Sequence, residues 1–142
     1  MRHRTTLPFA LLLVALAGAA RAGEWVGNAQ AVDGQTIAID GKHLRLAGIQ
    51  AVTKGPKGFC WDRYYNPNFC DIAARWHLDD LIAYKRVTCS GDQRDDKGVP
   101  LVRCAAGDLN LNREMVRAGW ATSREYQTEE DLARQEKVGM WQ

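Results

Sequence analysis

Apolar and polar residues alternate along residues 25–47, and Asp-Gly pairs interrupt the alternation at Asp33 and Asp40. A period of two places the apolar side chains on one face of a strand, and Asp-Gly between two such runs is a strong signal for a tight hairpin turn. The pattern therefore predicts a meander of three antiparallel strands, over residues 25–32, 36–40 and 43–47.

The next segment, residues 51–68, has no regular period and is rich in Gly, Pro, Asn and aromatic residues. This composition predicts an ordered loop, and loops of such length are usually functional or cross-linked. Apolar residues then recur at helical spacing over residues 71–84, with Asp71 favourably placed at the positive end of the helix dipole. A long loop that leads into a helix is therefore predicted after the meander.

The last third of the chain predicts two strands and then two helices. A polar turn over residues 91–98 joins the strands, and Gly119 ends the first helix. Thr128 precedes three acidic residues and is predicted to be the N-cap of the second helix. The predicted strands are residues 86–90 and 99–105, and the predicted helices are residues 109–118 and 128–138. One α+β domain results, with five strands, one helix after the third strand and two helices at the end.

The beginning of the chain differs from the rest. Basic residues precede an apolar run over residues 7–20, and Ala20-Arg21-Ala22 has the small-x-small form of a signal-peptidase site. We therefore predict a signal peptide over residues 1–22 and one mature domain over residues 23–142, located in the periplasm or secreted. A retained membrane anchor is the alternative, but the apolar run is shorter than the roughly 20 residues that span a bilayer.

Composition and charge narrow the range of partners. The hydrophobic content of 46% and the charged content of 25% are ordinary for a globular domain. The net charge of the whole chain is +2, but without the three arginines of the predicted signal peptide 16 basic side chains face 17 acidic ones, a net charge of −1. Proteins that bind polyanions usually have a basic surface, so nucleic acid is expected to bind weakly at best. A monomer that binds a protein or a small anionic ligand is expected instead.

Four cysteines lie in the predicted mature domain, where an oxidising compartment favours disulfides, and three pairings are open from their number alone. A bond between Cys60 and Cys70 would join the loop to the following helix, and Cys89 and Cys104 approach each other if the two later strands pair antiparallel. We therefore predict the disulfides Cys60–Cys70 and Cys89–Cys104. A zinc site with His77 is the alternative, which the lack of a Cys-x-x-Cys pair disfavours.

Four stretches of the sequence resemble signatures of the staphylococcal nuclease (thermonuclease) family, and the similarity covers residues 25–141. The stretches are residues 32–37 (VDGQTI), 44–51 (LRLAGIQA), 109–121 (LNLNREMVRAGWA) and 133–141, which ends in Gly139-Met140-Trp141. The resemblance implies a five-stranded OB-fold barrel with three helices. The resemblance also implies the position of the calcium-dependent nuclease site that active members of the family have.

The family's chemistry uses carboxylates that hold calcium, a carboxylate that activates water, and two arginines that clamp the phosphate. The resemblance places Gln35 and Gln50 where the family has calcium-binding aspartates, and Thr53 where it has the water-activating glutamate. Arg45 matches one arginine, whereas Val99 stands at the position of the other. Arg45 is thus the one catalytic match, and the sequence predicts a degenerate active site.

Several residues are candidates for binding rather than catalysis. Asp33 matches a calcium-binding carboxylate, but one carboxylate beside two neutral amides is a poor calcium site, so a turn residue is the simpler interpretation. Arg45 either binds an anion or pairs with Asp33 or Asp40. Four aromatic residues are candidates either to stack bases in a groove or to pack over the disulfide, namely Trp61, Tyr64, Tyr65 and Tyr126. Three tryptophans have positions typical of a core, namely Trp76, Trp120 and Trp141.

These observations favour an exported, catalytically inactive domain that works as a binding or structural module without a cofactor. One alternative is a calcium-dependent phosphodiesterase with residual or altered activity, in which Asp33, Asp40 or a loop residue supplies a ligand. Another is a weak single-stranded nucleic-acid binder that uses Arg45 and the loop aromatics. A dependence on calcium would identify the first alternative, and a strong dependence on salt the second.

Overall fold

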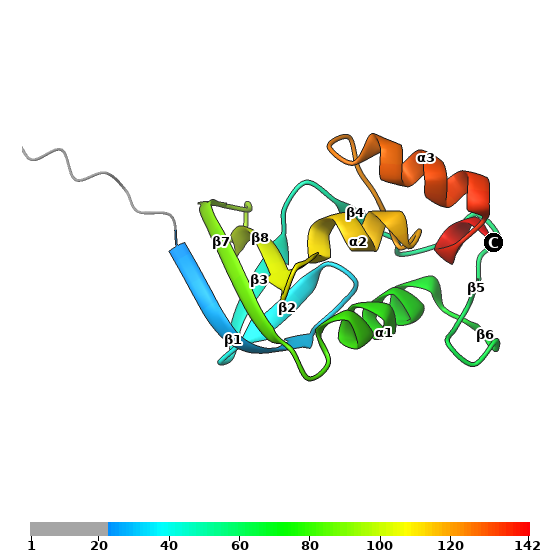
Figure 1. The fold of residues 1–142 in the computed structure, drawn as a ribbon. Coiled ribbons are helices and arrows are strands. Elements are labelled where there is room, and N and C mark those ends of the chain that lie inside the picture. The colour runs from blue at the N-terminus through cyan, green and yellow to red at the C-terminus, as the bar shows by residue number, and fades with distance from the viewer. Residues whose placement is uncertain (1–22) are drawn as a thin grey trace, which may run out of the picture.

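The computed structural model describes residues 23–142, so the predicted signal peptide lies outside the described residues. Five main strands form an antiparallel sheet that curves and closes into a barrel through a parallel contact between β3 and β8 (Figure 1). They are β1 (Gly23–Ala31), β2 (Thr36–Ile39), β3 (Lys42–Leu46), β7 (Arg86–Arg94) and β8 (Pro100–Ala106). The predicted α+β class and five-stranded barrel are confirmed.

The described chain also contains three helices and a short 3-10 helix. They are α1 (Cys70–Ile82), α2 (Leu111–Arg117), α3 (Gln127–Glu136) and η1 (Gly139–Trp141). The helices lie together at the end of the molecule where the C-terminus is found, and α2 packs against α1, α3 and β8 (Figure 1). The helix α2 therefore connects the barrel to the other two helices.

Short strands organise the connecting segments. The strand β4 (Gln50–Ala51) pairs with β10 (Ala121–Thr122), and β9 (Leu109–Asn110) pairs with β8. Within the segment predicted as an ordered loop, β5 (Cys60–Trp61) pairs with β6 (Pro67–Asn68). This β5–β6 hairpin lies beside η1, at the end of the molecule away from β3 (Figure 1).

The strand β7 is longer than the predicted strand over residues 86–90. Its last residues, Asp92 to Arg94, are polar and exposed, so they lack the apolar alternation that predicts a strand. The register with β8 shifts between Ser90 and Gln93, and the turn proper begins at Asp95. The predicted turn over residues 91–98 is therefore wrong in its first half.

The two C-terminal helices begin at positions that differ from the prediction. Residues 109 and 110 pair with β8 before α2 starts, and the Asn110 side chain caps α2 by accepting a hydrogen bond from the Arg113 N–H at 3.0 Å. Thr128 is not the N-cap of α3, which starts at Gln127. The Ser123 hydroxyl instead accepts hydrogen bonds from the backbone N–H groups just before α3, at 3.0 and 3.1 Å.

The core fills the barrel and continues beneath α1 and α2. Its largest fully buried aliphatic and thioether side chains are Ile37, Leu44, Leu46, Leu78, Leu111 and Met115. Trp120 is buried as predicted, but Trp76 is only half-buried and lines a surface cleft, so its assignment to the core is wrong. Trp141 is also half-buried and packs against the core, with the Arg134 guanidinium 3.8 Å from the centre of its ring.

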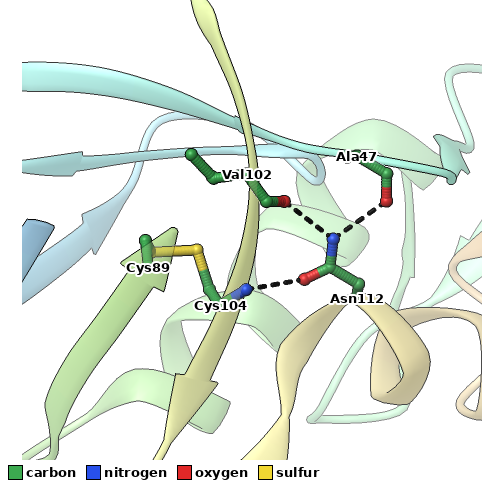
Figure 2. The surroundings of a disulfide bond; sticks show 5 residues. All are labelled: Ala47, Cys89, Val102, Cys104 and Asn112. Carbon is green, nitrogen blue, oxygen red and sulfur yellow. Dashed lines mark hydrogen bonds between the residues drawn. A yellow bond between two sulfur atoms is a disulfide. The ribbon is translucent and has the colours of Figure 1, made fainter. Parts of the chain in front are cut away.

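A buried asparagine holds the barrel closed. Asn112 of α2 is fully buried, and its Oδ1 accepts a hydrogen bond from the Cys104 N–H at 3.0 Å (Figure 2). Its Nδ2 donates to the carbonyl oxygens of Ala47 at 2.9 Å and Val102 at 3.0 Å (Figure 2). Because Ala47 directly follows β3 and Val102 belongs to β8, this one side chain links the two strands that close the barrel.

Both disulfides have the predicted pairing, so the four sulfurs do not form a zinc site. The bond between Cys60 and Cys70 joins β5 to the first residue of α1, and the bond between Cys89 and Cys104 joins β7 to β8. In the part of the chain that the structure describes, no helix is long and apolar enough to cross a membrane.

Candidate functional site

Gln35 precedes β2 and is buried, with 6% of its surface exposed. Asp33 shapes the turn before it, because Asp33 Oδ1 accepts hydrogen bonds from the backbone N–H groups of Gln35 and Thr36, both at 2.7 Å. The Gln35 Nε2 donates to the carbonyl oxygens of Leu46 at 3.2 Å and Ile49 at 2.7 Å. Asp33 therefore has the geometry of a turn residue, and Gln35 ties the turn to the end of β3.

The oxygen of the Gln35 amide also has partners. It accepts hydrogen bonds from the Ala51 N–H at 3.0 Å and from Arg45 Nη2 at 3.4 Å. Calcium requires six to eight oxygen ligands, whereas the Gln35 amide nitrogen presents its hydrogens to the nearby carbonyls. In residues 23–142, no group of three or more His, Cys, Asp or Glu side chains is placed to hold a metal ion. The residues present therefore do not fit a calcium ion.

Arg45 and Val99 lie on neighbouring parts of the barrel. Arg45 is half-buried on β3 and pairs in register with Leu101 of β8. Val99 comes two residues before Leu101, and alternate residues of an extended chain share a face, so position 99 lies on the Arg45 side. Arg45 forms no ion pair with Asp33, Asp40 or any other acid of the described residues, and its polar contact is with Gln35.

Gln50 and Thr53 are both exposed. The pairing of β4 with β10 brings Gln50 opposite Thr122, and Gln50 lines a cavity together with Gly48, Ser123 and Glu125. Position 50 therefore lies close to position 35, because Ala51 donates its N–H to the Gln35 side chain. Thr53 lies three residues after Gln50 in the chain, so the residues that the resemblance assigned to one site belong to one region.

A cluster of polar side chains, which the sequence did not predict, lies beside this cavity. Arg103 Nη2 pairs with Glu125 Oε1 at 2.8 Å, and Arg103 Nη1 donates to the Tyr126 hydroxyl at 3.1 Å. The ion pair lowers the pKa of Glu125 and raises that of Arg103. Gly48 lies directly under the Glu125 carboxylate, so that a Cβ at position 48 would collide with it. Glu125 therefore contributes to the cavity wall as one half of an ion pair, and Arg124 lines the same cavity.

The predicted aromatic set is not brought together. Trp61 and Tyr65 line a cleft beside α1, while the exposed ring of Tyr64 lies 6.0 Å from the Arg63 guanidinium. Tyr126 is half-buried against the core and contacts Arg103. Tyr126 thus lies in the region of Gln35 and Arg45, whereas the other three belong to the β5–β6 hairpin at the far end of the molecule (Figure 1).

The two histidines of the described chain have different surroundings. His43 is exposed on β3. His77 of α1 lies in the cleft beside Trp61, with its ring centre 6.2 Å from that of Trp120. Burial lowers the pKa of His77, and this effect outweighs the opposing charge of Asp80. His77 is therefore neutral near pH 7.

Comparison with known proteins agrees with the fold. The profile of the family described as Staphylococcal nuclease homologue matches residues 43–142, which is more than half of the chain. No curated protein sequence matches the chain. The match includes Arg45, Gln50, Thr53 and Val99, but not the turn that carries Gln35. With its barrel, helix order and matched residues, the chain belongs to the staphylococcal nuclease homologue family.

Proposed function

We propose that this protein is an exported member of the family that has lost nuclease catalysis and works as a binding or structural module. The single observation that carries the proposal is the hydrogen bonding of Gln35. Its amide joins the turn, the end of β3 and the start of β4, in the place where the family resemblance puts a calcium-binding aspartate. A neutral group in a structural role thus stands at the proposed metal site.

The surrounding residues support the same proposal. A phosphate clamp of two arginines is reduced to Arg45, because position 99 holds valine. Removing one strong electrostatic stabiliser from an active site typically slows catalysis by about 100-fold to 1000-fold, so the combined replacements leave little activity to measure.

Export is part of the proposal, with a signal peptide over residues 1–22 and a mature domain over residues 23–142. Both disulfides support it, because such bonds persist in the periplasm and outside the cell rather than in a reducing cytosol. A cell-fractionation experiment and the N-terminal sequence of the isolated protein would test it. Mature protein that begins at Gly23 is expected, and an uncleaved N-terminus would contradict the assignment.

The catalytic part is tested by incubating pure protein with denatured DNA and with RNA in millimolar calcium. The natural protein is expected to be inert. A variant with Gln35→Asp, Gln50→Asp, Thr53→Glu and Val99→Arg is expected to gain calcium-dependent cleavage, and the same variant with Arg45→Ala is the matched control that should lose it. Calcium-dependent cleavage by the natural protein would instead support the residual-nuclease alternative.

A further inference from the structure

A cleft of about 470 Å³ lies between the β5–β6 hairpin, α1, α2 and the C-terminal segment. Its volume falls in the range of small-molecule sites, roughly 300–1,000 Å³. It shares no residue with the region of Gln35, Arg45 and Gln50. The cleft is therefore a separate site, to which neither the family resemblance nor the family comparison assigns a role.

Aromatic side chains form much of its wall. Trp61 is 41% exposed and Tyr65 is 86% exposed, although both carry large apolar rings. Trp76 of α1 is half-buried and also lines the cleft. The Trp61 ring packs in a T-shaped arrangement with Phe59, 5.6 Å between ring centres, and the Arg63 guanidinium lies 5.4 Å from the centre of the Trp76 ring. The exposed part of Trp61 and the ring of Tyr65 are therefore the aromatic surface available for stacking.

Hydrogen bonds fix the turn of the hairpin between Trp61 and Asn66. Asp62 Oδ1 accepts hydrogen bonds from the backbone N–H groups of Tyr64 at 2.8 Å and Asn66 at 3.0 Å, and these bonds lower the pKa of Asp62. Tyr65 has a φ of 60°, which side chains other than glycine rarely adopt, and the Tyr65 N–H donates to the Asp62 carbonyl. The exposed Tyr84, which follows α1, has nearly the same φ of 59°, so this conformation defines the local turn and does not by itself mark a site.

The polar groups of the cleft provide both donors and acceptors with little net charge. Asp80 pairs with Arg63 at 2.8 Å, and each partner retains unused hydrogen-bonding positions. His77 is neutral and therefore provides one donor and one acceptor. Glu114 is half-buried and makes no ion pair with any residue in 23–142. Arg117 also lines the cleft, but its guanidinium pairs with Glu136 at 2.9 Å. Among the described lining residues, both arginines are therefore paired, and a phosphate would face the unpaired Glu114 carboxylate.

We propose that this cleft binds a neutral pyranose sugar within a short oligosaccharide. One face of a pyranose ring presents C–H groups, which stack on the electron-rich faces of Trp61 and Tyr65. Its hydroxyls both donate and accept, which matches the Arg63–Asp80 pair, His77 and Glu114. A nucleotide has a stackable ring as well, but its phosphate is disfavoured by Glu114. The hydrogen bonds that fix the turn of the hairpin lower the entropy lost on binding.

The proposal is tested by titrating the protein with hexamers of β-1,4-linked glucose and of N-acetylglucosamine while recording tryptophan fluorescence. Saturable binding to at least one of them is expected. The Trp61→Ala variant is expected to bind at least about 10-fold more weakly, as expected for the loss of one aromatic stacking platform. Trp61→Phe should retain most of the affinity, and Tyr84→Ala, which changes an exposed aromatic residue outside the cleft, should leave it unchanged.

Three results would overturn the proposal. The first is the lack of a saturable response to either hexamer up to roughly 10 mM. The second is binding that the Trp61→Ala substitution leaves unchanged. The third is tighter binding to a uronic-acid hexamer or to poly(dT) than to the two neutral hexamers. The inference deepens the proposed binding role, and the two can fail separately because calcium-dependent cleavage is measured on the same samples. Thermal unfolding of each variant checks that the fold is intact.

Discussion

Replacing Asn112 with alanine removes all three hydrogen bonds of the side chain that closes the barrel. Val102 keeps a partner, because its carbonyl oxygen also accepts a hydrogen bond from the Ala47 N–H at 2.8 Å. The Cys104 N–H and the Ala47 carbonyl are then left without the partner they have in the native structure. Each unsatisfied buried group costs about 1–3 kcal/mol, so we expect Asn112→Ala to lower the free energy of unfolding by about 2–6 kcal/mol.

Such a loss is a large part of the roughly 5–15 kcal/mol that stabilises a typical domain. The assay is urea denaturation followed by tryptophan fluorescence, with the slope of the transition compared between variants. Asn28→Ala is the matched control, because Asn28 is exposed on β1, and its effect should stay within about 0.5 kcal/mol. A loss below about 1 kcal/mol for Asn112→Ala would refute the reasoning, since it would mean that water satisfies both groups.

Three further outcomes are expected. The pKa of His77 is lowered in the folded state, so the unfolded state binds more protons as the pH falls. The thermal midpoint of the natural protein should therefore fall as the pH drops below about 6.5, and the midpoint of the His77→Gln variant should fall less. Removing the Cys89–Cys104 disulfide by double alanine substitution should cost about 3 kcal/mol in urea unfolding, given its separation of 15 residues. In the same assay, Gly98→Ala should lower the free energy of unfolding by about 1 kcal/mol, and Gly119→Ala should lower it by more. Both glycines have a φ of +80°, but only at Gly119 would a Cβ collide with backbone atoms.

The elements that the sequence predicts well depend on local signals. Strands β2 and β3 agree with the prediction within one residue, because the turn before each begins with an Asp-Gly pair. The disulfide pairing was predictable for a similar reason, since Cys89 and Cys104 lie on strands joined by a single turn. Periodicity and turn chemistry act over a few residues, so a single sequence reveals them.

Features that depend on distant residues were not predicted. The start of α3 follows from Ser123, whose hydroxyl also donates to the Gly48 carbonyl, 75 residues earlier in the chain, at 2.6 Å. The Arg103–Glu125 pair joins residues 22 apart, and neither position has a pattern that indicates its partner. Trp76 is a large apolar residue at a position typical of a core, but it lines the cleft between α1 and the β5–β6 hairpin. Loop conformation and side-chain pairing across the fold decide these features.

Closure of the barrel between β3 and β8 has a consequence for incomplete chains. The contacts that close it join segments far apart, such as Asn112 and Ala47, which are separated by 65 residues. Contacts of this kind form late because the loop-closure entropy must be overcome first. Until β8 has docked, β3 presents unpaired backbone groups along one edge, and such an edge pairs readily with another chain. Fragments that end before β8 are therefore expected to aggregate through β3, whereas the closed barrel protects this edge.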